Sequence, residues 1–427
     1  MTSEETIMVD TDREIKIIRD LAKRVAEIAS DPVHEEKKQL WTKLNRLERV
    51  RPLIHVQAID KSIWSELLPE DQFQCEDPFM RKQEEMLRRK IYCWEHFKDD
   101  RVVDDVVPCR LVIQGDSRST VYGIPIKYEK PDMEYGAKKI IPMLKEEKDI
   151  DMIQTDPKVW VDWDETEKNY TRLSELYDDI LRVEKKGVDF FGFGFIDIII
   201  RWRGIEQTFV DLIERPSWIH DLLGRMSKAL ISSCRQLEEL GLLSRGDGNT
   251  MLGSGGYGWT DQLPKSDFDG KRVRLKDIWA RAATQIFTEV ISPEVHDEFA
   301  IRYEKPLLEL FGLTAYGCCE PLHNKLKYVK KIGNLRRISL SPWVDIDKAA
   351  SEVGMDYVYT HKPNPSLVSM SSWDLEIPKQ ELKKALEKTR GNVVEVNLQD
   401  LHTVQNQPQR LTEWAEMAFD LAEQYAN

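Results

Sequence analysis

The sequence has no apolar run long enough to cross a membrane. Its most apolar stretch, FFGFGFIDIII at 190–200, is short and contains Asp197. The first twenty residues are acidic and polar, without the basic start and apolar segment typical of a secretory leader. We therefore expect a cytoplasmic protein with no membrane partner.

The sequence also lacks an excess of positive charge and a cysteine framework. The formal net charge is −13, which argues against a nucleic-acid partner. The six cysteines are scattered, except for the adjacent Cys318 and Cys319, so we expect free thiols rather than structural disulfides. A hydrophobic fraction of 41% is typical of a globular chain, and a homodimer is the default assembly.

Strand-like and helical patterns alternate regularly from about residue 165 onward. This predicts an α/β protein, a (β/α)8 TIM barrel over 51–427, with a helix-rich N-terminal extension at 1–50. An inserted strand pair and helices are expected near 77–165, with a turn at Gly115–Asp116. Residues 171–187 are expected to form a single helix.

Catalytic groups of a TIM barrel lie at the carboxyl ends of its strands. Polar residues follow the expected strands at His55, Asp197, 247–250, 318–320, 341–343, 361–365 and 400–402. The segment Cys318-Cys319-Glu320 is the most reactive of these, because thiolates, a carboxylate and a nearby imidazole suit Zn²⁺. We predict Cys319, Glu320, His402 and Cys318 as metal ligands. The alternative for the two cysteines is a buried apolar pair.

The segment 246–259, GDGNTMLGSGGYGW, is rich in glycine but matches neither phosphate-loop pattern. We expect its backbone to approach a flat substrate, with Tyr257 and Trp259 as stacking surfaces. The alternative is a surface loop without a binding role.

Three segments resemble the uroporphyrinogen decarboxylase superfamily: 204–223, 291–312 and 317–343. The resemblance spans roughly residues 165–425. RPLIHVQAID at 51–60 stands where true decarboxylases carry an arginine-rich motif, so the sequence is more similar to the superfamily's other branch, the zinc-dependent corrinoid-linked methyltransferases. Cys319 lies fourteen residues before Gly333, as the first cysteine of that branch does, while Gly317 replaces its histidine and 400–402 its last cysteine.

The resemblance implies methyl transfer from an aryl methyl ether, an O-demethylation, to the cob(I)alamin of a separate corrinoid protein. Zinc would act on the ether oxygen as a Lewis acid. The ring would lie against Tyr257, Trp259 and Trp343. The polar groups expected to contact the substrate or assist catalysis are Asn249, Asp247, His361 and Glu320. A metal-independent decarboxylase of a carboxylated tetrapyrrole or aromatic, and a non-catalytic barrel that binds a corrinoid or tetrapyrrole, are the alternatives.

Overall fold

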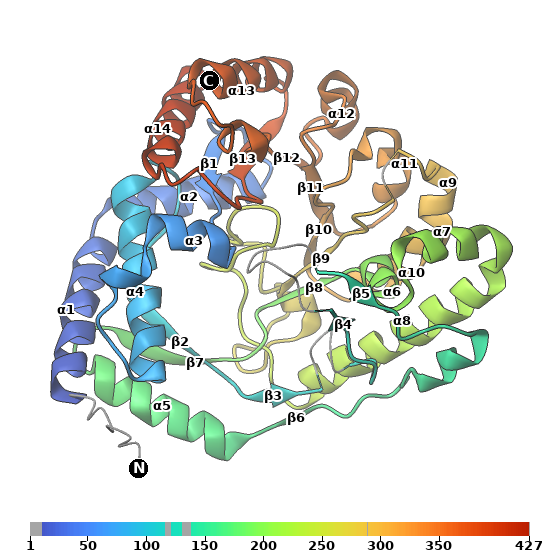
Figure 1. Ribbon diagram of the computed structural model, residues 1–427, viewed down its shortest axis with the longest axis horizontal. Helices are drawn as coiled ribbons and strands as arrows, with labels where there is room; N and C mark the ends of the chain where they lie inside the picture. Colours follow the sequence, from blue (N-terminus) through green and yellow to red (C-terminus); the bar gives the residue numbers. More distant parts are fainter. Residues whose placement is uncertain (1–10, 116–120, 130–137, 288, 427) are drawn as a thin grey trace, which may run out of the picture.

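A curled parallel sheet organises the computed structural model, which describes residues 11–115, 121–129, 138–287 and 289–426. Within these residues seven strands pair in the order β1-β13-β12-β11-β10-β9-β8 (Figure 1). Their bounds are Leu53–Val56 (β1), Phe190–Phe193 (β8), Trp279–Ala282 (β9), Leu313–Tyr316 (β10), Leu335–Leu340 (β11), Val358–His361 (β12) and Val393–Leu398 (β13). All pairs are parallel, so the carboxyl ends of the strands share one rim.

Helices surround the sheet on its outer face (Figure 1). They are Thr11–Ala29 (α1), Val33–Asn45 (α2), Lys61–Leu67 (α3), Pro78–His96 (α4), Trp163–Tyr177 (α5), Phe195–Arg203 (α6), Ile205–Glu214 (α7), Pro216–Glu239 (α8), Pro293–His296 (α9), Arg302–Leu308 (α10), Leu326–Val329 (α11), Ile346–Val353 (α12), Glu376–Lys388 (α13) and Gln409–Gln424 (α14). A π-helical turn, Asp297–Ile301, joins α9 to α10.

Alternate residues of each strand face opposite sides of the sheet, which separates two kinds of interior. On the outer side, residues such as Ile54, Ile338 and Val396 are fully buried in the main apolar core with the helices. The inner side carries polar groups, including the buried ion pair of Arg337 and Glu395. The parallel sheet of this α/β fold thus forms a half-barrel whose inner side is polar.

The second helix of the expected N-terminal extension, α2, packs against this half-barrel. Trp41 of α2 is fully buried with Tyr257, Val358 and Val393, and its Nε1 donates to the carbonyl of Asp100 at 2.8 Å. Helix α2 therefore closes the amino end of the strands, where large apolar side chains would otherwise face water.

The open edge of β1 is covered by two carboxylates. Asp100 Oδ2 accepts from the amide of Ile54 at 2.7 Å, and Asp99 Oδ2 accepts from the amide of Val56 at 3.1 Å. Side chains therefore satisfy edge amides that an eighth strand would bind.

The expected single helix at 171–187 is wrong. Helix α5 ends at Tyr177, and residues Arg182–Lys186 form β7, parallel to β2 (Val106–Arg110). Asp179 adopts a left-handed φ of 63°, a conformation that does not continue a helix, and the chain turns there before β7 begins.

The expected strand pair near Gly115 is built differently. Residues Ile113–Gln114 (β3) pair antiparallel with Trp160–Val161 (β6), and Lys127–Tyr128 (β4) pairs with Ile140–Ile141 (β5). Asp116 of the expected turn lies outside the described residues. Among the described helices, none is long and apolar enough to span a bilayer.

Candidate functional site

The two adjacent thiols lie side by side just beyond β10. The strand ends at Tyr316, and Gly317 takes a left-handed φ of 98°, a conformation that favours glycine. The turn brings Cys318 Sγ within 3.4 Å of Cys319 Sγ, whereas a continuing strand would point them to opposite faces. Cys318 is 6% exposed and Cys319 is half-buried.

An ammonium group lies among the acceptors. Lys362, the residue after β12, places its Nζ 3.5 Å from Cys319 Sγ and 3.8 Å from Cys318 Sγ. The same Nζ is 3.0 Å from Asp400 Oδ2, beyond the end of β13. Cys318, Cys319, Lys362 and Asp400 are called the thiol centre below.

The thiol centre is buried on one side and open on the other. The Lys362 side chain is 3% exposed, and that of Asp400 is 47% exposed. Asp400 adopts a left-handed φ of 60°, uncommon for a residue with a Cβ, and this conformation aims its carboxylate at Lys362 and Cys319. Solvent therefore contacts the centre on the Asp400 side.

A chain of polar side chains supports the centre from inside the half-barrel. Ser254 Oγ donates to Cys318 Sγ at 2.8 Å, and Gln399 Nε2 approaches the same sulfur at 3.9 Å. Asn397 donates to Gln399, and its Oδ1 lies 3.2 Å from His55 Nδ1. His55, Asn397 and Gln399 point inward because they alternate with apolar residues along β1 and along β13 and its continuation.

The surroundings of the thiol pair favour a negative charge on Cys318 over one on Cys319. The hydrogen bond from Cys319, with the charges of Arg281 and Lys362, lowers the pKa of the Cys318 thiol well below its ordinary value, although burial opposes this effect. The same hydrogen bond and burial raise the pKa of Cys319. Burial acts to raise the pKa of Asp400, but the charge of Lys362 and hydrogen bonds from Gln399, Lys362 and Cys319 together lower it. The centre therefore combines a thiolate, a thiol, an ammonium and a carboxylate.

The four predicted metal ligands are not brought together. Glu320 is 1% exposed and its Oε2 lies 3.3 Å from Lys325 Nζ; burial raises its pKa to about 7. His402 has a side chain 71% exposed, and its Nδ1 lies 3.2 Å from Asp60. Among the described residues, no group of three or more histidine, cysteine or acidic side chains is arranged to hold a metal ion. Cys318, Cys319, Glu320 and His402 thus do not fit zinc as a set, and Lys362 supplies the cation beside the thiols.

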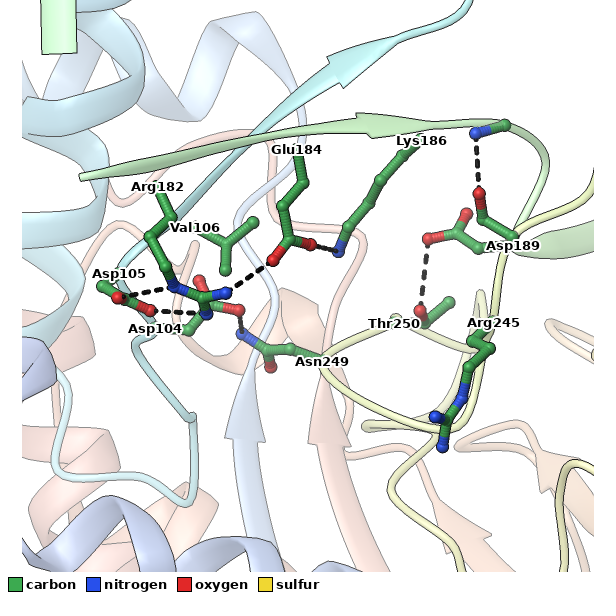
Figure 2. Close-up of polar contacts among 12 residues, drawn as sticks. Asp104, Asp105, Val106, Arg182, Glu184, Lys186, Asp189, Arg245, Asn249 and Thr250 are labelled. Atoms are coloured by element: carbon green, nitrogen blue, oxygen red, sulfur yellow. Dashed lines mark hydrogen bonds and ion pairs between the residues drawn. The ribbon is translucent and has the colours of Figure 1, made fainter. Parts of the chain in front are cut away.

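One predicted substrate residue, Asn249, lies in a different charged region, along β2 and β7. Asn249 donates to Asp104 Oδ2 at 3.1 Å, and the neighbouring Thr250 donates to Asp189 (Figure 2). Asp247 is ion-paired with Arg245. The residues of this region are called the β2–β7 cluster below: Asp104, Asp105, Arg182, Glu184, Lys186 and Asp189.

The glycine-rich segment fills the half-barrel instead of lining an open cleft. In Figure 1 the yellow chain between α8 and β9 runs inside the curve formed by the strands. A Cβ on Gly256 would lie 2.1 Å from the Trp41 ring, and one on Gly255 would lie 2.9 Å from Glu395 Oε1. The glycines are therefore needed where backbone passes close to the protein's own interior.

The predicted aromatic and histidine residues are dispersed. Tyr257 is buried against Trp41, and Trp259 lies against Lys38. Trp343 is 66% exposed. His361 is buried, and no described residue forms a hydrogen bond with either of its ring nitrogens. Burial lowers the pKa of its imidazole to about 4. None of these contacts places a predicted aromatic ring or His361 beside the thiol centre.

Sequence reasoning missed Lys362 and Asp400 as members of the thiol centre, and Ser254 and Gln399 as side chains that support it. Lys362 and Asp400 lie at strand ends that the sequence indicated as candidate sites. The histidines near them, His361 and His402, were assigned the functional roles instead. Polar residues at alternate positions, such as Asn397 and Gln399 in an otherwise apolar strand, were the available signal for a polar inside.

Comparison of the chain with models of known protein families and with curated proteins found no match.

Proposed function

We propose that the chain is an enzyme that transfers a methyl group from a methyl ether to the cob(I)alamin of a separate corrinoid protein. One observation carries the proposal: two adjacent thiols, a buried ammonium and a half-exposed carboxylate meet at the carboxyl ends of β10, β12 and β13, where catalytic groups of such folds lie. The proposal includes a TIM-type barrel, a cytoplasmic location and an aryl ether as the methyl donor.

Lys362 is the general acid of the proposed reaction. The C–O bond of the ether breaks, the methyl carbon passes to the corrinoid, which supplies the nucleophile, and the oxygen keeps the bonding electron pair. The ammonium of Lys362 donates a proton to that oxygen, and Asp400, 3.0 Å away, orients the ammonium. The half-exposed Asp400 side admits the substrate. No step is assigned to zinc.

Purified protein offered cob(I)alamin and a panel of methoxyarenes, methanol and methylamines tests the proposal. We expect methylcobalamin to form with a methoxyarene, and Cys318→Ala and Cys319→Ala to lose this activity. Cys93→Ala, which changes a buried cysteine of the apolar core, is the matched control. Full activity in both thiol variants, or no transfer from any donor, would sink the assignment.

Elemental analysis tests the zinc prediction separately from turnover. About one equivalent of zinc, lost in Cys319→Ala, would show that a ligand set assembles around the thiols. Absence of stoichiometric zinc in an active preparation would assign the cation's part to Lys362.

A decarboxylase is the second candidate, and one observation favours it. Arg281 donates to the carbonyl of Gly317 at 3.0 Å, and with Lys362 it places two cations near the thiols. Such cations attract a carboxylated substrate. Release of carbon dioxide from a tetrapyrrole or aromatic acid without any corrinoid would favour this reaction, and binding without turnover would favour a carrier.

A further inference from the structure

The pairing of the two thiols points to chemistry beyond methyl transfer. Cys318 Sγ and Cys319 Sγ are 3.4 Å apart, and Cys319 is half-buried, on the side where Asp400 meets solvent. The other four cysteines, Cys75, Cys93, Cys109 and Cys234, are buried, and burial raises their pKa values. Reactivity toward oxidants is thus concentrated at one pair.

We propose that Cys318 and Cys319 form a reversible disulfide with each other when the protein meets a hydroperoxide. The modification would be a switch at the thiol centre, independent of which reaction the centre catalyses. It follows from the S–S contact, the solvent-facing side and the cation beside both sulfurs.

The steps balance with hydrogen peroxide as the oxidant. The Cys318 sulfur attacks one peroxide oxygen, so an S–O bond forms, the O–O bond breaks, and the leaving hydroxide takes a proton from Lys362. Cys319 then attacks the Cys318 sulfur, the S–S bond forms, and the S–O bond breaks with release of water. The thiol pair loses two electrons, the peroxide becomes two waters, and Lys362 regains its proton from solvent.

The resulting bond would be easily reduced. Neighbouring Cα atoms are about 3.8 Å apart, closer than the roughly 4.4–6.8 Å of ordinary disulfides, so the ring is strained. Strained disulfides are labile and suit regulation. Oxidation removes the thiolate that accepts from Ser254 at 2.8 Å and leaves Lys362 with Asp400 as its ionic partner. The centre therefore loses the charge favoured on the Cys318 sulfur.

Peptide mass spectrometry tests the inference on the reduced full-length chain. After equimolar hydrogen peroxide and alkylation under denaturing conditions, the peptide with Cys318 and Cys319 should be lighter by two hydrogens and unalkylated. Dithiothreitol should restore both alkylated thiols. Peptides with Cys75, Cys93, Cys109 and Cys234 should stay fully alkylated and serve as internal controls.

Cys319→Ser provides the decisive variant, because serine keeps the size of the side chain but cannot form the bond. The loss of two hydrogens must disappear in this variant, while a sulfenic acid on Cys318 appears. Sulfinic acid on the wild-type pair, a disulfide between chains, or an unreacted pair would overturn the inference. Because the readout is mass, it fails or succeeds independently of the methyl-transfer assay.

Discussion

The thiol centre and the β2–β7 cluster both pair a cation with a carboxylate, but their cations differ in burial. Lys362 in the centre is 3% exposed, whereas Arg182 in the cluster is 62% exposed and pairs with Asp105, 45% exposed. Exposed pairs contribute about 0–1 kcal/mol, because water screens the charges and the side chains lose entropy. The burial of the cation, and not the number of ion pairs, distinguishes the thiol centre from the β2–β7 cluster.

The largest expected effect comes from removing the buried ammonium of the centre. Lys362→Met keeps the length of the side chain but removes the proposed acid, so we expect kcat/KM for methyl transfer to fall by about 10²–10⁴-fold. Steady-state methylcobalamin formation measures it. Lys186→Met, in the β2–β7 cluster, is the matched control and should leave turnover unchanged. Equal losses in both variants would contradict the comparison.

The buried ion pair of Arg337 and Glu395, which includes no thiol, tests how strongly a buried charge depends on its partner. Arg337 and Glu395 have side chains 1% exposed, and Glu395 also accepts from the amide of Gly256. Glu395→Ala leaves Arg337 buried and unpaired, so we expect a loss of about 3–5 kcal/mol in the free energy of unfolding. Urea denaturation measures the loss. Glu184→Ala in the exposed cluster should cost much less, and similar costs would show that burial is unimportant.

His361 shows the effect of burial without that of an ion pair or hydrogen bond, because no described residue is a hydrogen-bond partner of either ring nitrogen. Its pKa is lowered to about 4 in the folded chain, against about 6.5 when unfolded. The unfolded state therefore takes up the proton first, and stability is lost as pH falls from 6.5 to 4. Relative to pH 7.5, we expect His361→Leu to be more stable than the wild type at pH 5 by about 2 kcal/mol.

Urea denaturation at the two pH values measures this difference. His402→Leu is the control, since it makes the same substitution at a side chain that is 71% exposed. An unchanged slope in His361→Leu would show that the imidazole finds a partner in solution.

The smallest effect is expected at the surface. Arg182→Ala removes the ion pairs with Asp105 and Glu184, and we expect a loss of less than about 1 kcal/mol that shrinks as salt increases. Thermal unfolding at low and high ionic strength measures it. A loss comparable to that of Glu395→Ala would break the distinction between the two regions.

Much of the fold was predictable because its signals are local. The apolar spacing of α1, α8 and α14 predicted helices, and the short apolar runs of β1, β11 and β13 predicted strands. The helix expected at 171–187 failed because its second half fits a strand equally well, and pairing with β2 decided between them.

The candidate site was predictable in part. The cysteines were found because their chemistry is visible in the sequence, and strand ends gave the correct rim. His402 was preferred as the partner, yet it lies against Asp60, while Lys362 and Asp400 meet the thiols. The direction of a side chain after a strand ends depends on local φ values and distant contacts, which no periodic pattern encodes.

The sequence by itself determined the alternating strands and helices and the reactive pair Cys318-Cys319. The tertiary structure alone decided that a glycine-rich segment fills the half-barrel and that Lys362 and Asp400 complete the thiol centre. The physical reason is the range of the interactions. Periodicity arises between neighbours along the chain, whereas the thiol centre joins residues 43 and 81 positions apart, brought together only when parallel strands end at one rim.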